Sequence, residues 1–416
     1  MTTRDSAGIQ IVDNTAAVWQ AGEAWQLSEQ PTLNIGTDVG APEYEFGYAH
    51  GPVRLSDGRI VVADMQTQQM RFYDAQGKFL MSAGGSGMGP GEFEQLFRLR
   101  KIVGDSLMAL NPTSLTSIFS SDGKYVRRFD LDAVRMRGNM WWLGRLWDGT
   151  LLTMSLQREG TRELAPPPNP RPGVEEARFD VPQRDPMYRD TLLHFLYTMD
   201  GRLIDSIVKL PGQWLGEQRV LVPNAAYAFF ENTFYHSPGD IVEIRQYRSL
   251  AGERIAPAPT TRSVPLVKLE RIIRRAPLRP AAITDEDKKQ YLEAERARYT
   301  DLARRNPGRI NMTRVEQGLA DTKFPPTVPA HGNRMYTDAL GNLWLQEYRI
   351  GPQEPFRWSI FDTEGRWLGM VQTPAEFTLN EIGTDYVLGV TQDSLGVQYV
   401  RMYSLQKPAR VTEQSQ

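Results

Sequence analysis

The sequence predicts an all-β protein built from one repeated four-stranded unit. Three observations support this prediction: a four-strand pattern over residues 52–93, the recurrence of its last hairpin turn along the chain, and a composition rich in turn residues. Within 52–93, strand-sized runs of Val, Ile, Phe and Tyr are separated by Asp-Gly and Gln-Gly turns, which is typical of successive hairpins. Four such strands cannot bury both faces of their sheet, so neighbouring units of the same kind are expected.

The last hairpin turn of this unit recurs through the chain. Each copy has an aromatic residue, a short polar turn, a glycine that can adopt positive φ, and a charged residue that opens the next strand. The glycines of the five copies are Gly77, Gly123, Gly201, Gly252 and Gly365, and the copy at Gly252 is the loosest. Recurrence on this scale indicates a repeat architecture.

The composition fits a soluble β protein and argues against some partners. The chain has 416 residues, with 35 Gly and 28 Pro, and its 48 basic and 50 acidic side chains nearly cancel. Because no net field results, nucleic acid is not an expected partner. The absence of cysteine excludes disulfides, thiolate nucleophiles and Cys-based zinc sites.

No membrane or export segment is expected in this sequence. No apolar run approaches the roughly 18 residues that a membrane-spanning helix needs. The first residues, Met-Thr-Thr-Arg-Asp-Ser, lack the apolar stretch of a signal peptide. A chain from which a signal peptide had been removed would read the same.

Taken in order, the chain supplies six units. Residues 1–23 read as a lead-in, and residues 24–36 as one or two strands interrupted by Pro31. The units are expected over residues 52–84, 106–131, 139–210, 225–275, 333–373 and 377–405. The last unit has three strands of its own, so residues 24–36 are expected to add the fourth and close the ring without open edges. The sequence therefore predicts a six-bladed β-propeller over residues 24–405, followed by a tail at 406–416.

Two insertions interrupt this pattern. Residues 157–190 are too rich in proline for the interior of a strand or helix. Residues 276–330 contain a predicted helix that begins at a capping Thr284 and carries acidic residues in its first turn. The spacing from Gly77 to Gly123 is 46 residues, close to one propeller blade of about 40–50 residues, and the longer spacings fall where the insertions lie. Both insertions are expected on one face, where they could cover the mouth of the central channel.

Residues 71–93 and 340–369 carry a family resemblance. Their F-D-x-x-G-[KR]-[FW]-L turn and G-x-G-P-G-E-F link resemble the NHL-like six-bladed β-propellers, a broad bacterial group. The resemblance extends from about residue 24 to residue 405 and implies a propeller fold, which hosts binding, scaffolding and catalytic roles alike. Many similar bacterial proteins are exported, so the resemblance also implies a periplasmic or cell-envelope location for the untrimmed form.

A second resemblance concerns the start of the first blade. The sequence His50-Gly-Pro-Val53, with Asp64 at the end of the next strand, is similar to the E-G-P-x-W entry of gluconolactonase-like propellers. In that family the glutamate binds a divalent metal. Here histidine takes its place, and the later metal-binding strands of that family have no counterpart.

Polar side chains collect at the strand ends on the predicted channel face. His50 and His331 precede innermost strands, and the other candidates end second strands. The complete set of predicted ligand-binding residues is His50, Asp64, Asn111, His236, His331 and Glu347. Such a ring could bind Ca²⁺ or Zn²⁺, with His50, Asp64 and His236 as the metal ligands, or provide a general base. The alternative is that these are ordinary strand-end residues satisfied by water.

The sequence favours a binding or interaction protein. A small molecule or a protein partner is expected to dock at the channel mouth beneath the insertions, and no established enzyme motif is present. One alternative is a metal-dependent hydrolase or lyase that uses His50, Asp64, His236 and Glu347. The other is a structural scaffold of the cell envelope, with the insertions as its contact surface.

Overall fold

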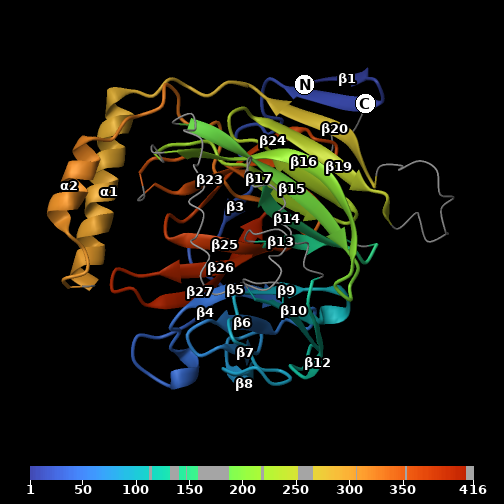
Figure 1. Cartoon of the computed structure of the whole chain (residues 1–416), viewed down its shortest axis with the longest axis vertical. Helices are drawn as coiled ribbons and strands as arrows, with labels where there is room; N and C mark the ends of the chain where they lie inside the picture. Colours follow the sequence, from blue (N-terminus) through green and yellow to red (C-terminus); the bar gives the residue numbers. More distant parts are fainter. Residues whose placement is uncertain are drawn as a thin grey trace, which may run out of the picture.

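The computed structural model describes residues 1–111, 115–131, 140–146, 148–157, 187–216, 220–251, 266–305, 307–351 and 354–408. These residues form six sheets, each built around four consecutive blade positions that pair antiparallel (Figure 1). Blade 1 contains β5 (Ala49–Arg54), β6 (Ile60–Asp64), β7 (Gln69–Tyr73) and β8 (Phe79–Gly84). Blade 2 contains β9 (Arg98–Lys101), β10 (Leu107–Leu110), β11 (Thr116–Phe119) and β12 (Tyr125–Phe129). Blade 3 contains β13 (Met140–Arg145), β14 (Leu151–Gln157), β15 (Met187–Tyr197) and β16 (Leu203–Gly216).

The second half of the chain repeats the pattern. Blade 4 contains β17 (Ala226–Phe230), β18 (Thr233–Ser237), β19 (Glu243–Ser249) and β20 (Val267–Arg275). Blade 5 contains β21 (Met335–Thr337), β22 (Leu343–Gln346), β23 (Phe356–Phe361) and β24 (Trp367–Thr373). Blade 6 contains β25 (Phe377–Ile382), β26 (Tyr386–Gln392) and β27 (Gln398–Gln406) from this end of the chain.

The core lies between the blades. Each consecutive pair of blades shares a buried apolar cluster, and a further cluster joins blade 6 to blade 1. All five residues of β6 are buried, because blades 6 and 2 cover the two faces of this sheet. Six sheets that pack in sequence, with the last against the first, form a closed ring. The chain is a six-bladed β-propeller.

The N-terminal part of the chain closes this ring. Two short strands, β3 (Gln26–Leu27) and β4 (Leu33–Ile35), pair antiparallel with β27. Leu33 and Ile35 are buried in the cluster that joins blades 6 and 1. The predicted closure by residues 24–36 is therefore confirmed, and it removes the open edge that β27 would otherwise present.

The first fourteen residues have a role that the sequence did not predict. They form β1 (Thr2–Ser6) and β2 (Ile9–Asn14), and β2 pairs in parallel with β20 at the outer edge of blade 4. Blade 4 thereby becomes a six-stranded sheet. The buried Asn14 amide donates to the carbonyl oxygens of Arg274 (3.1 Å) and Gly365 (2.9 Å), and its oxygen accepts from the Trp367 amide (2.9 Å). One side chain thus ties the N-terminal hairpin to blades 4 and 5.

The helical insertion connects β20 to β21. It contains α1 (Asp285–Arg305) and α2 (Met312–Ala320), which lie side by side at one edge of the molecule (Figure 1). The predicted cap is present: the Thr284 hydroxyl accepts from the Asp287 amide (3.1 Å), while Asp287 accepts from the Thr284 amide (2.8 Å). Tyr291 packs edge-on against Phe324 at 5.7 Å. In the described part of the chain, no helix is both long and apolar enough to cross a membrane.

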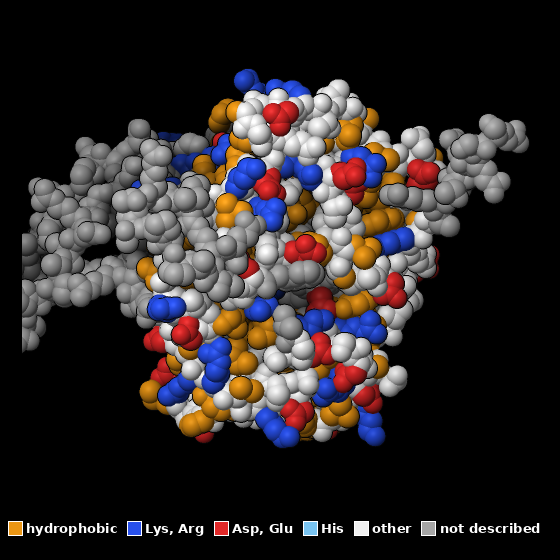
Figure 2. All heavy atoms as spheres, turned by 90° about the vertical axis from the view of Figure 1, so that its right-hand side faces the viewer, with side chains coloured by type: hydrophobic (Ala, Val, Ile, Leu, Met, Phe, Trp, Pro, Cys, Tyr) orange, Lys and Arg blue, Asp and Glu red, His pale blue; other side chains and the backbone are white. Residues whose placement is uncertain are grey.

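The other predicted insertion, residues 157–190, is too long at both ends, since Gln157 ends β14 and residues 187–190 open β15; residues 158–186 lie outside the described part of the chain. The outer strand of blade 4 is Val267–Arg275, while the looser turn at Gly252 lies outside the described part of the chain. On the face shown in Figure 2, basic and acidic side chains are interspersed, in keeping with the nearly balanced charge of the chain.

We expect Asn14→Ala to lower the free energy of unfolding by about 1–3 kcal/mol, because it leaves buried backbone groups of blades 4 and 5 without partners. Urea denaturation followed by tryptophan fluorescence measures this change. The matched control is Asn333→Ala at an exposed position just before β21, where the expected change is below about 0.5 kcal/mol. Equal effects of the two substitutions would contradict this role of Asn14.

Candidate functional site

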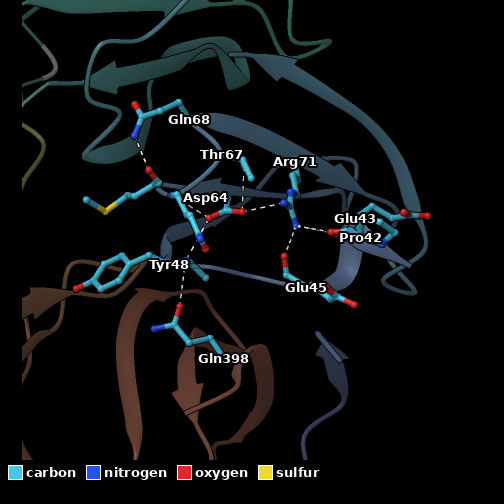
Figure 3. Close-up of polar contacts among 12 residues, drawn as sticks. Pro42, Glu43, Glu45, Tyr48, Asp64, Thr67, Gln68, Arg71 and Gln398 are labelled. Atoms are coloured by element: carbon cyan, nitrogen blue, oxygen red, sulfur yellow. Dashed lines mark hydrogen bonds and ion pairs between the residues drawn. The ribbon is translucent and has the colours of Figure 1, made fainter. Parts of the chain in front are cut away.

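Asp64 ends β6 and is completely buried. One carboxylate oxygen accepts from the backbone amides of Tyr48 and Gln66, each at 3.1 Å. The other accepts from the Thr67 hydroxyl (3.0 Å) and forms an ion pair with Arg71 (2.8 Å) (Figure 3). Both oxygens are therefore occupied within the protein, and Asp64 fixes the β6–β7 turn and the entry to β5.

Arg71 extends this network to the segment that follows the closing strand β4. Its guanidinium donates to the carbonyl oxygens of Pro42 (3.1 Å), Glu43 (3.2 Å) and Glu45 (2.8 Å), as Figure 3 shows. Because one cation satisfies three carbonyls and one carboxylate, the pair is a structural anchor between the return segment and blade 1.

Glu347 follows β22 and makes a bidentate ion pair with Arg275 at the end of β20. The two N···O distances are 2.8 and 3.0 Å, and both side chains are largely buried. The Ser359 hydroxyl donates to the same carboxylate at 2.6 Å and accepts from Arg275 at 2.7 Å. This arrangement joins blade 4 to blade 5, so both Glu347 oxygens are engaged in holding the ring.

His331 and His236 are buried residues of blade junctions. Nδ1 of His331 donates to the Gly332 carbonyl (2.5 Å), so its Nε2 accepts from the Ser237 hydroxyl (2.7 Å). Nε2 of His236 donates to the Pro211 carbonyl (3.1 Å). Burial lowers the pKa of both imidazoles, that of His236 to about 3, so both are neutral near pH 7.

His236 belongs to a buried aromatic group between blades 3 and 4 that includes a further histidine. Tyr227 lies 5.2 Å from His236 and 5.4 Å from His194, measured between ring centroids. Neither ring nitrogen of His194 has a hydrogen-bond partner of good geometry among the described residues. Burial lowers the pKa of His194 to about 4. These imidazoles act as neutral packing groups at neutral pH.

Asn111 follows β10, and its backbone N–H donates to the Leu115 carbonyl oxygen at 3.2 Å. This bond closes the loop between β10 and β11, of which residues 112–114 lie outside the described part. Asn111 therefore belongs to a turn of blade 2.

His50 lies in β5 near the channel, in a positive environment. Burial, together with the charges of Arg98, Arg100 and Arg334, lowers the pKa of His50 to about 4. Its buried Nδ1 has no hydrogen-bond partner among the described residues. Burial chiefly, and the three arginine charges in addition, keep the imidazole neutral near pH 7.

A small cavity lies beside the residues that follow His50 in β5. It has a volume of about 70 Å³ and is bounded by the innermost strands of blades 1, 2, 5 and 6. Its lining residues are Gly51, Pro52, Val53, Arg98, Leu99, Arg100, Tyr336 and Asn380. The Asn380 side-chain oxygen is buried without a partner in the described structure. The cavity is therefore small and polar, and strongly basic on the blade 2 side.

Arg98 and Arg100 lie on the same face of β9, because alternate residues of a strand share a face. Burial lowers the pKa of both guanidinium groups, that of Arg100 to about 10, and the like charge of Arg334 lowers that of Arg98 further. Among the described residues, none of these three arginines forms an ion pair within 4.0 Å. They constitute a cationic cluster without a direct ion-pair partner among the described residues, which we call the channel arginines.

The six predicted ligand-binding residues therefore have different structural roles in the fold. The predicted metal set of His50, Asp64 and His236 is not assembled, since the described residues include no group of three or more His, Asp or Glu side chains that could hold a metal ion. The physical reason is that Asp64 is neutralised by Arg71, His236 is buried with its Nε2 bonded to a carbonyl, and His50 faces cations.

The channel arginines were missed by sequence reasoning. Their signal was present in the alternating Arg98-Leu-Arg100 pattern, which places two cations on one face of a short innermost strand. The sequence does not show that Arg334 lies near these two arginines, because it stands more than two hundred residues away, at the start of blade 5. Only folding brings its charge close to theirs.

The geometry defines a six-bladed β-propeller with a small basic cavity in its channel. Comparison with known families agrees with this class: residues 45–103 match the family described as 6-bladed beta-propeller. No curated protein matches the chain. The matched residues include one of the two segments that carry the resemblance seen in the sequence, while the NHL-like subdivision of that class stays a prediction.

Several solved structures have a similar fold. A putative exported protein from Bacteroides fragilis is 11% identical, with a TM-score of 0.46 over 96% of this chain and 99% of that chain. A calcium-binding protein, regucalcin, from Agrobacterium tumefaciens is 10% identical, with a TM-score of 0.40 over 88% and 93%. A streptogramin B lyase is 9% identical, with a TM-score of 0.37 over 92% and 98%. At these values the likenesses say nothing about the function of this chain.

We expect Asp64→Asn to destabilise the protein by about 3–5 kcal/mol, because it leaves the buried Arg71 charge without its counter-charge. Thermal and urea denaturation followed by circular dichroism measure this loss. The control is Asp57→Asn, which removes the partner of Arg59 at an exposed turn and should change stability by less than about 1 kcal/mol. A loss in Asp64→Asn no larger than in the control would contradict the anchoring role.

Stability should fall as the pH is lowered from about 6.5 to about 4. In this window the unfolded chain, with ordinary histidine pKa values near 6.5, binds protons that buried His194 and His236 do not bind. His194→Phe should remove part of this slope and leave stability at pH 7.5 nearly unchanged. Urea midpoints of both proteins at several pH values test this, and an unaltered slope in the variant would contradict it.

Proposed function

We propose that the protein is a binding protein that holds a small anionic group in the central channel, against the channel arginines. The observation that carries this proposal is that Arg98 and Arg100, which form no ion pair among the described residues, line a polar cavity of about 70 Å³, with the charge of Arg334 near enough to lower the pKa of Arg98. That volume corresponds to roughly two water molecules, which suits a carboxylate or phosphate group.

The electrostatics support an anion as the missing partner. Burying several guanidinium groups together is unfavourable, because desolvation and mutual repulsion both disfavour the charged forms. An anion bound among them would offset this cost and could accept paired hydrogen bonds from the planar guanidinium groups. The neutral His50 and the unpartnered Asn380 oxygen add polar contacts for the rest of a ligand.

The nearby carboxylate does not fulfil this role, because it is engaged elsewhere. Glu381 directly follows Asn380 of the cavity lining, but its carboxylate accepts from the Arg54 backbone amide at 3.1 Å and from the Tyr386 hydroxyl, and lies 3.7 Å from the Lys101 ammonium. Its charge raises the pKa of Arg100 only in part, since burial and Arg98 outweigh it. The basic cavity therefore keeps its positive character.

The sequence also led us to expect that a small molecule or a protein partner docks at the channel mouth, and the proposed anion site agrees with this expectation. Covering of the mouth by residues 157–190 stays a prediction, because most of that segment lies outside the described residues. We also propose a cell-envelope location, because the sequence resembles that of exported propellers.

Inorganic phosphate should bind saturably and raise the pKa of His50, because a nearby anion favours the imidazolium form. NMR titration of the four histidine side chains with phosphate measures both effects, and His194, His236 and His331 should shift little. The double substitution Arg98→Gln with Arg100→Gln should weaken phosphate binding about tenfold or more.

The matched control is Arg304→Gln on the exposed surface of α1, which should leave phosphate binding unchanged. The proposal is wrong if phosphate produces no saturable shift of His50, or if the double variant and the control bind phosphate as tightly as the unaltered protein.

A further inference from the structure

Three aromatic rings stand together where β5 and β9 begin. The imidazole of His50 lies between Tyr48, at 6.4 Å and nearly parallel (16°), and Phe97, at 5.5 Å and 31°. Tyr48 is 51% exposed and Phe97 is 37% exposed. The group, which we call the aromatic entrance, therefore presents two accessible rings on either side of a partly buried one.

The aromatic entrance adjoins the channel arginines. Phe97 directly precedes Arg98, and the Arg98 guanidinium lies 5.6 Å from the centre of the Phe97 ring. His50 directly precedes Gly51, which lines the basic cavity. Apolar planar surface and cationic groups are thus adjacent. Burial, together with the charges of the channel arginines, keeps His50 in its neutral form, in which an imidazole stacks as an uncharged ring.

Core packing does not account for this arrangement. A residue that serves only to fill the interior is buried, as are Phe72 and Phe119 in the cluster between the same two blades. Tyr48 and Phe97 instead keep much of their surface accessible, just before the strands β5 and β9 that line the polar cavity. Exposed aromatic rings beside a site with few, convergent polar groups are characteristic of small-molecule recognition.

We propose that the ligand is an organic anion with a flat aromatic group, such as an aryl phosphate or an aryl carboxylate. Its anionic group binds the channel arginines, and its ring stacks on Phe97, the ring of the aromatic entrance that adjoins Arg98. This inference rests on the proposed anion site and adds the chemical class of the ligand. The cavity of about 70 Å³ admits only the anionic end, so the aromatic end remains at the entrance.

The experiment compares three phosphates by isothermal titration: inorganic phosphate, phenyl phosphate and cyclohexyl phosphate. Phenyl phosphate should bind about tenfold more tightly than inorganic phosphate, in line with about 1.4 kcal/mol of stacking. The saturated ring of cyclohexyl phosphate should recover only part of this gain. The double variant Tyr48→Ala with Phe97→Ala should bind phenyl phosphate no more tightly than inorganic phosphate.

Two variants make the result specific. Phe97→Tyr keeps an aromatic ring and should retain the preference for phenyl phosphate, whereas Phe97→Leu keeps an apolar side chain and should lose much of it. Because the substituted positions are partly exposed, thermal midpoints should stay close to that of the unaltered protein, which separates loss of binding from loss of folding.

The possible failures are distinct. If inorganic phosphate binds and phenyl phosphate binds no better, the aromatic class of ligand is rejected and the anion site stands. If phenyl phosphate is preferred equally by the unaltered protein and by the Tyr48→Ala, Phe97→Ala variant, the aromatic entrance is rejected as the subsite. If neither compound binds, the proposed function itself fails.

Discussion

Closure of the ring is the constraint on which the rest of the structure depends. Six sheets can bury both of their faces only if the last meets the first, and β4 makes that junction by pairing with β27. The ion pair between Asp64 and Arg71 then fixes the segment that returns from β4 to β5. A cavity that draws its walls from blades 1, 2, 5 and 6 exists only because this junction is shut.

The fold could be predicted largely from the sequence because its determinants are local. The glycine turns and alternating strands identified the blades, and the missing strand of the last blade identified the closing segment. The parallel addition of β2 to β20 could not be predicted in the same way. Its pattern, a short apolar run near the N-terminus, specifies a strand but not its partner, and the partner is chosen by buried contacts such as those of Asn14 more than 250 residues away in sequence.

The candidate site was predictable only in part, for an electrostatic reason. A sequence shows that Asp64 and Glu347 are acidic, but not that each is already neutralised by an arginine. Nor does a sequence show the opposite situation, in which Arg98, Arg100 and Arg334 have no acidic ion-pair partner among the described residues. The type of a residue predicts which ligands its side chain can bind. Whether that side chain is free to bind one depends on which charges are already paired in the folded structure.

The parallel pairing of β2 with β20 and the pairing of β4 with β27 have a consequence for how the chain acquires its structure. Both N-terminal segments reach their partners only after long stretches of later sequence exist, so during synthesis they leave the ribosome without a sheet to join. Contacts of such high sequence separation form late, since the entropy of closing the intervening loop must first be overcome. Both strands are thus made before their partners and pair with them late: β4 then closes the ring, and β2 extends the outer edge of blade 4.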